Sequence, residues 1–118
     1  MTALLTRLTT ATAGSRELDA EVAMALGWQK VGTLWWSPYR ADGSSSGRVG
    51  SPPFTTSLDP AFAEVERRGL SIDVWVSLSG MASCCIWRTE DETAPDYTAA
   101  TPALAACAAL IAAVEAGS

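Results

Sequence analysis

The sequence predicts a small α/β (α+β) protein with a single domain, residues 1–118, built on a mostly antiparallel sheet of three or four strands. Three observations support this fold class. Apolar and polar residues alternate between Ser71 and Thr89, the period of a half-buried strand pair. Apolar residues recur at spacings of three and four in other segments, which is the helical period. A chain of 118 residues with 48 % hydrophobic residues can bury one core. We therefore expect helices to pack on at least one face of the sheet.

The segment from Ser71 to Thr89 predicts a β-hairpin. One face carries a row of apolar side chains, which are Ile72, Val74, Val76 and Leu78. Ser79-Gly80-Met81 supplies the turn, because glycine readily takes the positive φ that tight turns require. A lone hairpin is only marginally stable in water, so helices must cover the apolar row. Trp75 falls on the opposite face.

The N-terminal third predicts two helices and a strand. The first helix covers residues 2–12, and Ser15 is placed to cap the second, which runs from Arg16 to Leu26. Gly27 is placed to end that helix. Trp28 to Trp36 contains β-formers and is predicted to be one strand, with a bulge at Gly32.

The rest of the chain predicts a loop and two further helices around the hairpin. Residues 37–56 are rich in glycine, serine and proline, so we expect a long flexible loop. Pro60 suits the first turn of a third helix that ends at Arg68. We expect four of its charged residues to face water: Glu64, Glu66, Arg67 and Arg68. Thr101 caps an alanine-rich last helix that ends at Gly117.

Composition excludes several classes of function. The chain has 8 basic and 13 acidic residues, which argues against binding polymeric nucleic acid. No apolar run reaches the roughly 20 residues of a membrane span and the start lacks a signal-peptide pattern, so we expect a cytoplasmic protein. With no histidine and three scattered cysteines, we predict buried inert thiols and no metal site or cofactor. These thiols are Cys84, Cys85 and Cys107.

Aromatic and arginine residues suggest where a ligand would bind. The candidate ligand-binding residues are Trp36, Tyr39, Arg40, Arg48, Trp75 and Trp87. Exposed aromatic surface commonly marks a ligand pocket or a protein interface, whereas a sheet covered on both faces would make every tryptophan part of the core. Between Arg40 and Arg48 the glycines and serines could cradle an anion, or form only a solvated loop. The acidic residues from Glu90 to Asp96 match no calcium-binding loop and read as a solvated turn.

Three segments together resemble the phage "ABA sandwich" domain family. They are SRELDAEVAMALGW (Ser15 to Trp28), PPFTTSLDPAFAEVERRG (Pro52 to Gly69) and TPALAACAALIAAVEA (Thr101 to Ala116), and they cover about 48 of the 118 residues. The family pattern has tyrosine where this chain has Phe54. The resemblance implies a three-layer α-β-α sandwich and a phage or prophage origin, with action in the cytoplasm of a bacterial host. It brings no catalytic residue.

No catalytic constellation is visible, since the chain has no histidine base and no nucleophile elbow, so we do not expect an enzyme. The leading hypothesis is a phage accessory protein that acts by binding a small anionic or nucleotide-like ligand, such as a host immune signal that it would sequester. The alternative is a module that docks a host or phage protein through an aromatic patch. A structural homo-oligomer is compatible with both, because the alanine-rich last helix allows close approach of another chain.

Overall fold

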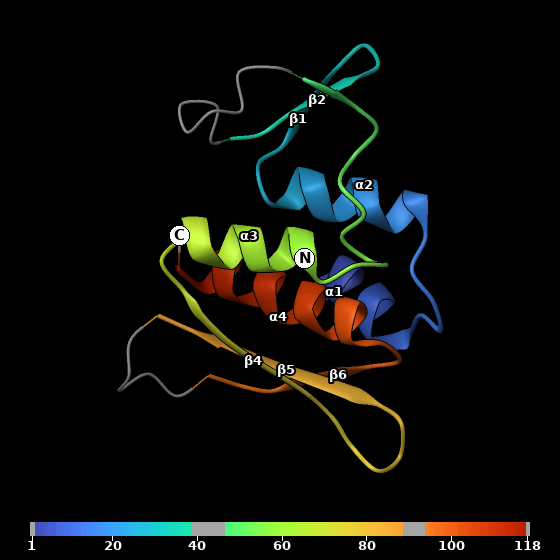
Figure 1. The fold of residues 1–118 in the computed structure, drawn as a ribbon, viewed down its shortest axis with the longest axis vertical. Coiled ribbons are helices and arrows are strands. Elements are labelled where there is room, and N and C mark those ends of the chain that lie inside the picture. The colour runs from blue at the N-terminus through green and yellow to red at the C-terminus, as the bar shows by residue number, and fades with distance from the viewer. Residues whose placement is uncertain (1, 39–46, 89–93, 118) are drawn as a thin grey trace.

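The structure is a computed structural model that describes residues 2–38, 47–88 and 94–117 (Figure 1). Within these ranges the elements are α1 (Thr2–Thr10), α2 (Arg16–Ala25), β1 (Gln29–Val31), β2 (Leu34–Trp36), β3 (Arg48–Val49), α3 (Asp59–Arg67), β4 (Ser71–Val76), β5 (Ala82–Trp87), β6 (Tyr97–Ala99) and α4 (Pro102–Gly117). The helix starts follow the predicted caps. Ser15 Oγ accepts a hydrogen bond from Leu18 N (3.1 Å) and Thr101 Oγ1 accepts one from Leu104 N (3.2 Å).

The predicted hairpin is confirmed, and its strands are β4 and β5, which pair antiparallel. β6 pairs antiparallel with the other edge of β5, which gives the strand order β4-β5-β6. Ile72 lies opposite Ile86 and Val74 opposite Cys84, and these two residues of the apolar row face the helices. Val76, at the end of β4, is 60 % exposed, so its predicted burial is wrong. The connection is wider than predicted, because Ser77 N bonds Met81 O (2.9 Å) and the chain turns at Gly80. Leu78 therefore lies in the loop and is fully exposed, and its predicted place on the buried face is wrong.

The segment predicted as one strand, Trp28 to Trp36, is a second hairpin. Gly32 has a φ of +64° at the first central position of a two-residue turn, where a type II′ turn needs glycine. β1 and β2 pair across this turn, and β2 also pairs with β3. Gly32 thus reverses the chain instead of forming the predicted bulge, because a positive φ at this position folds the strand back on itself.

α4 is the central element of the core. Every residue from Ala103 to Ile111 is buried, and the helix contacts β4, β5, β6, α1, α2 and α3. A helix that is apolar on every face is stable in water only if other elements cover all of its faces. Its alanines let the neighbouring elements approach closely, so their small size serves packing within one molecule.

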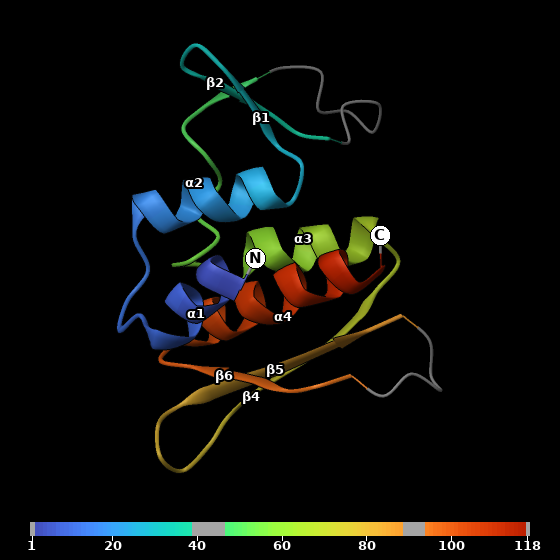
Figure 2. The same ribbon diagram turned by 180° about the vertical axis from the view of Figure 1, so that it is seen from behind.

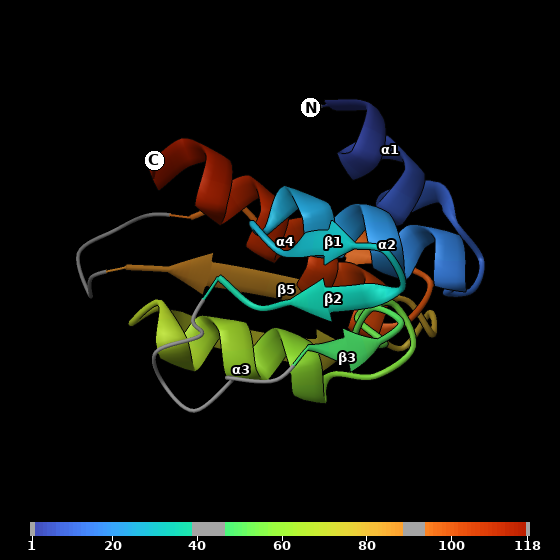
Figure 3. The same ribbon diagram turned by 90° about the horizontal axis from the view of Figure 1, so that it is seen from above.

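The fold class is confirmed, with a different order of layers from the expected α-β-α sandwich. The helices α1, α3 and α4 pack on one face of the β4-β5-β6 sheet, and α2 packs on the other side of α4 (Figures 1 and 2). The β1-β2-β3 sheet lies beyond α2, at the opposite end of the molecule from the other sheet (Figure 1), and faces the viewer in Figure 3. The outer face of the β4-β5-β6 sheet carries no helix within the described ranges, and Trp75 is exposed there (39 %). The layers therefore run sheet, helices, sheet.

Part of the segment predicted as a flexible loop, residues 37–56, belongs to the core. It contains β3, and Phe54 and Thr55 are fully buried. Asp19 Oδ1 accepts hydrogen bonds from Thr55 N (2.7 Å) and Thr55 Oγ1 (2.6 Å), which ties this segment to α2. Gly14 lies so close that a Cβ there would be 2.1 Å from Thr55 O. None of the helices in the described ranges is long and apolar enough to cross a membrane.

Candidate functional site

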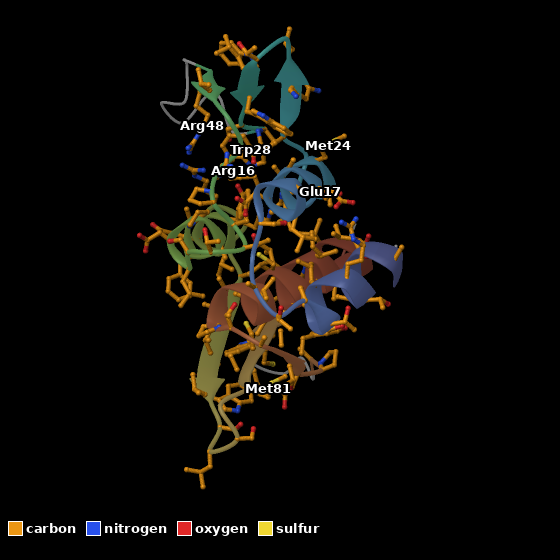
Figure 4. All side chains as sticks on the ribbon, turned by 90° about the vertical axis from the view of Figure 1, so that its right-hand side faces the viewer. Arg16, Glu17, Met24, Trp28, Arg48 and Met81 are labelled. Carbon is orange, nitrogen blue, oxygen red and sulfur yellow. The ribbon has the colours of Figure 1, made fainter. Side chains whose placement is uncertain are left out.

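A pocket of about 270 Å³ lies between α3, the segment that follows β3, and Trp28 at the end of α2. Its lining residues are Trp28, Arg48, Pro52, Phe54, Asp59, Pro60, Ala63, Glu64 and Arg67. Figure 4 shows Trp28 and Arg48 on this side of the molecule, with Arg16 close by and Met81 at the opposite end. The pocket thus combines aromatic surface with arginine side chains.

One face of α3 forms a wall of the pocket. Pro60, Ala63, Glu64 and Arg67 are spaced three and four residues apart, which places them on the same side of a helix. Pro60 is tolerated because it occupies the first turn, where its missing N–H would have no helical partner. The local sequence of α3 therefore sets which of its residues reach the pocket.

Glu64 is the buried charge of this wall. Its side chain is 1 % exposed, which corrects the prediction that it faces water. Oε2 accepts a hydrogen bond from Trp28 Nε1 (3.2 Å), and Oε1 accepts one from Arg68 Nε (3.3 Å). Arg68 also donates to Leu26 O (2.7 Å), one of the carbonyls left open at the end of α2. A buried carboxylate needs such partners, because an unpaired charge is very unfavourable in the interior.

Trp28 forms the aromatic wall. Gly27, with a φ of +97°, ends α2 and changes the direction of the chain. The Trp28 side chain that follows it reaches Glu64 on α3. The indole meets the Phe54 ring edge to face, with centroids 6.4 Å apart. Glu64 and Phe54 contact Trp28 from two directions, so contacts within the protein place this wall without a ligand.

Arginine side chains gather around the pocket, although the chain as a whole carries a formal net charge of −5 and the lining also contains Asp59 and Glu64. Arg48 and Arg67 line the pocket. Arg16 lies against the neighbouring backbone, where it donates to Ser51 O (2.9 Å) and pairs with Asp19 (3.0 Å). Within the described part of the chain, Arg48 is exposed and makes no hydrogen bond or ion pair. Arg48 is therefore available to a ligand, whereas Arg16 is held by the protein.

The predicted ligand-binding residues do not come together as one site. Arg48 lines the pocket, and Trp36 lies on β2 of the same sheet, packed against Gly47. Tyr39 and Arg40 lie outside the described residues, as does most of the predicted anion-binding loop. Trp75 and Trp87 belong to the other sheet, with the helical layer between them and Arg48 (Figure 1).

Trp75 and Trp87 are also separated from each other. Both side chains face away from the helices. Their cross-strand pairs, Trp75–Ser83 and Trp87–Ser71, alternate along the strands with the pairs whose side chains face the helices. Trp75 lies opposite Ser83, and Ser83 is four residues from Trp87 along β5, which corresponds to ~13 Å. The outer face thus carries two isolated indoles rather than a shared aromatic site.

Two of the three cysteines are buried as predicted, whereas the predicted burial of Cys85 is wrong. Cys84 and Cys107 are buried, and Cys107 Sγ donates to Phe54 O (3.1 Å). Cys85 points to the opposite face of β5 from Cys84 and is partly exposed. Burial, followed by the nearby Cys85 and carboxylates, raises the pKa of Cys84 from 9.0 to about 12. Burial likewise raises the pKa of Cys107. No cluster of three or more cysteine or acidic residues that could hold a metal is found in the described ranges.

Sequence reasoning missed Trp28, Glu64 and Arg67 as pocket residues. The spacing from Pro60 to Arg67 was a usable signal, since it predicts one shared helix face. The sequence offered no signal for which face would meet Trp28, because Trp28 and Glu64 are 36 residues apart. Comparisons with protein-family models, with curated proteins and with solved structures find no match for this chain. The resemblance to the phage "ABA sandwich" family therefore stays a prediction.

Proposed function

We propose that this protein acts by binding, and that its ligand is a small organic anion held in the pocket between α3, Trp28 and Arg48. The observation that carries the proposal is the pairing of Arg48 and Arg67 with an indole wall in one pocket. Guanidinium groups bind carboxylate and phosphate through charge-assisted hydrogen bonds, and Arg48 has no partner within the described part of the chain.

The size of the pocket limits the ligand. Its volume of about 270 Å³ is close to the lower end of the range of about 300–1,000 Å³ usual for ligand pockets. A single ring with one anionic group matches that volume and the aromatic and cationic lining, and a mononucleotide would place only its base or its phosphate inside the pocket. Asp59 at the rim disfavours a second negative group on the side of the ligand that faces it.

The role of such binding is also part of the proposal. The resemblance to phage proteins supports an accessory protein that sequesters a nucleotide-like signal of the bacterial host. The function would then require no chemistry at the pocket. In keeping with this, both oxygens of Glu64 already accept hydrogen bonds from Trp28 and Arg68, an arrangement that holds the wall in place.

Titration with a panel of small anions tests the proposal. We expect at least one of inorganic phosphate, adenosine monophosphate, cyclic adenosine monophosphate and benzoate to raise the melting temperature and change tryptophan fluorescence. A ligand at 100 times its dissociation constant stabilises the folded state by about 2.7 kcal/mol. No shift with any of the four at millimolar concentration would contradict the proposal.

Two variants locate the binding site. Arg48→Ala should weaken binding about tenfold or more, because it removes a charged hydrogen-bond partner of the ligand. Lys30→Ala removes one exposed positive charge from the same sheet without touching the pocket lining, so it should leave the affinity unchanged. Equal weakening by both variants would show that binding depends on net charge and not on this pocket.

A further inference from the structure

The hairpin loop between β4 and β5 exposes an unusual amount of apolar surface. Four large apolar residues within seven positions are exposed: Trp75 (39 %), Val76 (60 %), Leu78 (109 %) and Met81 (38 %). The loop bends away from the helical layer, and no helix or other strand of the described chain lies against it (Figure 1). Met81 marks this end of the molecule in Figure 4. We call these four residues the hairpin tip.

A second pocket, of about 470 Å³, has a mostly apolar lining of small residues. It is lined by Ala13, Gly14, Thr55, Thr56, Leu58, Thr101, Pro102 and Ala103. The polar groups of this lining are threonine hydroxyls, and none of its residues is charged. The Thr55 hydroxyl is already bonded to Asp19 and accepts from Ser15 N (3.0 Å), so it does not call for a polar ligand. We call this the apolar pocket.

The hairpin tip and the apolar pocket lie on the same side of the molecule. The α1–α2 connection contributes Ala13 and Gly14, and the connection from β6 to α4 contributes Thr101. Both connections, and the loop between β4 and β5, lie at the right-hand side in Figure 1. A two-fold axis passing between tip and pocket on that side would bring each tip of a pair to the pocket of the other copy.

We propose that two copies of this chain form a closed two-fold dimer in which each inserts its hairpin tip, with Leu78 foremost, into the apolar pocket of the other. Leu78 is the most exposed apolar side chain of the tip and projects from the turn that Gly80 makes possible. Burying it against Leu58, Pro102 and Ala103 removes apolar surface from water on both partners. The contact is made twice, because a two-fold interface repeats each pair.

The chemistry of the tip favours a second copy over a membrane. A membrane-inserting loop gains from lysine or arginine beside its apolar residues, since these are attracted to anionic lipids. The chain has no basic residue from Gly69 to Trp87, and its formal net charge is −5. The receptor for the tip, in contrast, is present in the same chain. Of α4, only the first turn with Pro102 and Ala103 takes part in this interface, because the helix from Leu104 to Ile111 is buried within the molecule.

Sedimentation equilibrium of three proteins tests the proposal. The unmodified chain should have a dimer mass at tens of micromolar, and Leu78→Asp should have a monomer mass, because a charge cannot enter an apolar pocket without loss. Val49→Asp places the same charge at another exposed valine (79 %), on β3 in the other sheet, and should remain a dimer. A monomeric unmodified chain, or a Leu78→Asp variant that stays dimeric, would overturn the proposal. Circular dichroism confirms that the variants are folded.

A mixing experiment tests whether the tip meets the pocket. Thr56 lines the apolar pocket and is exposed, so Thr56→Trp should fill the pocket without disturbing the core and should also give a monomer. An equimolar mixture of Leu78→Asp and Thr56→Trp retains one intact tip and one intact pocket. It should therefore form a heterodimer with an affinity between those of the unmodified dimer and the single variants. No association in the mixture, growth beyond a dimer, or binding of the monomer to phosphatidylcholine vesicles in place of dimerisation would refute the model.

Discussion

Trp28 Nε1 donates a hydrogen bond of 3.2 Å to Oε2 of Glu64, a carboxylate whose side chain is 1 % exposed. The bond joins the end of α2 to the middle of α3 and fixes two walls of the anion pocket relative to each other. Arg68 completes the arrangement from the same helix, one turn later, through Glu64 Oε1. The pocket is therefore preformed by contacts within the protein.

Replacing Glu64 should destabilise the fold. Glu64→Ala removes the acceptor of the Trp28 N–H and of Arg68 Nε, and we expect a loss of about 2–3 kcal/mol in the free energy of unfolding. Glu66→Ala removes an exposed carboxylate from the same helix and should change stability by less than about 0.5 kcal/mol. Urea denaturation of both variants measures the difference. Equal effects would show that the Glu64 contacts contribute nothing specific.

Removing the hydroxyl of Thr55 should destabilise the fold more than removing that of Thr56. Thr55→Val keeps the shape of the side chain but removes the donor to Asp19 and the acceptor for Ser15 N, at a loss of about 1–3 kcal/mol. Thr56→Val makes the same change at an exposed position and should be nearly neutral. Thermal unfolding of the pair provides the measurement. A neutral Thr55→Val would mean that Asp19 is satisfied by the Thr55 backbone N–H alone.

Thiol labelling should separate Cys85 from the other two cysteines. Cys84 and Cys107 are buried, and their raised pKa values keep them as unreactive thiols at neutral pH. Native protein should therefore label first at Cys85, and Cys85→Ser should abolish the fast phase. Mass spectrometry after brief alkylation identifies the site. Fast labelling of Cys107 in the native state would contradict its burial and its hydrogen bond to Phe54 O.

Stability should fall at alkaline pH. The pKa of Cys84 rises from 9.0 in the unfolded chain to about 12 in the folded one, so between these values only the unfolded state releases the proton. The free energy of unfolding is then unaffected by this group below pH 9 and decreases from pH 9 toward pH 12, by up to about 1.4 kcal/mol per pH unit. Cys107 acts in the same direction. Cys84→Ala should flatten the decline in urea denaturation midpoints measured from pH 8 to pH 11.

Local features of the fold could be predicted from the sequence because they depend on neighbours in the chain. The alternation from Ser71 to Val76 determines which side chains of β4 can be buried together, and the register with β5 follows it. Ser15 and Thr101 cap α2 and α4 through amides three residues further on. The apolar sequence of α4 requires a fully covered helix, whatever covers it.

The tertiary structure alone decided the pockets and the burial of single charged residues. Glu64 and Glu66 have similar local surroundings in α3, yet one is buried and the other exposed, because Trp28 arrives at Glu64 from 36 residues away. Leu78 continues the apolar row of β4 in the sequence, but the strand ends at Val76 and the turn carries Leu78 into solvent. The free energy of burial depends on all the atoms that surround a side chain, and most of those atoms come from distant parts of the chain.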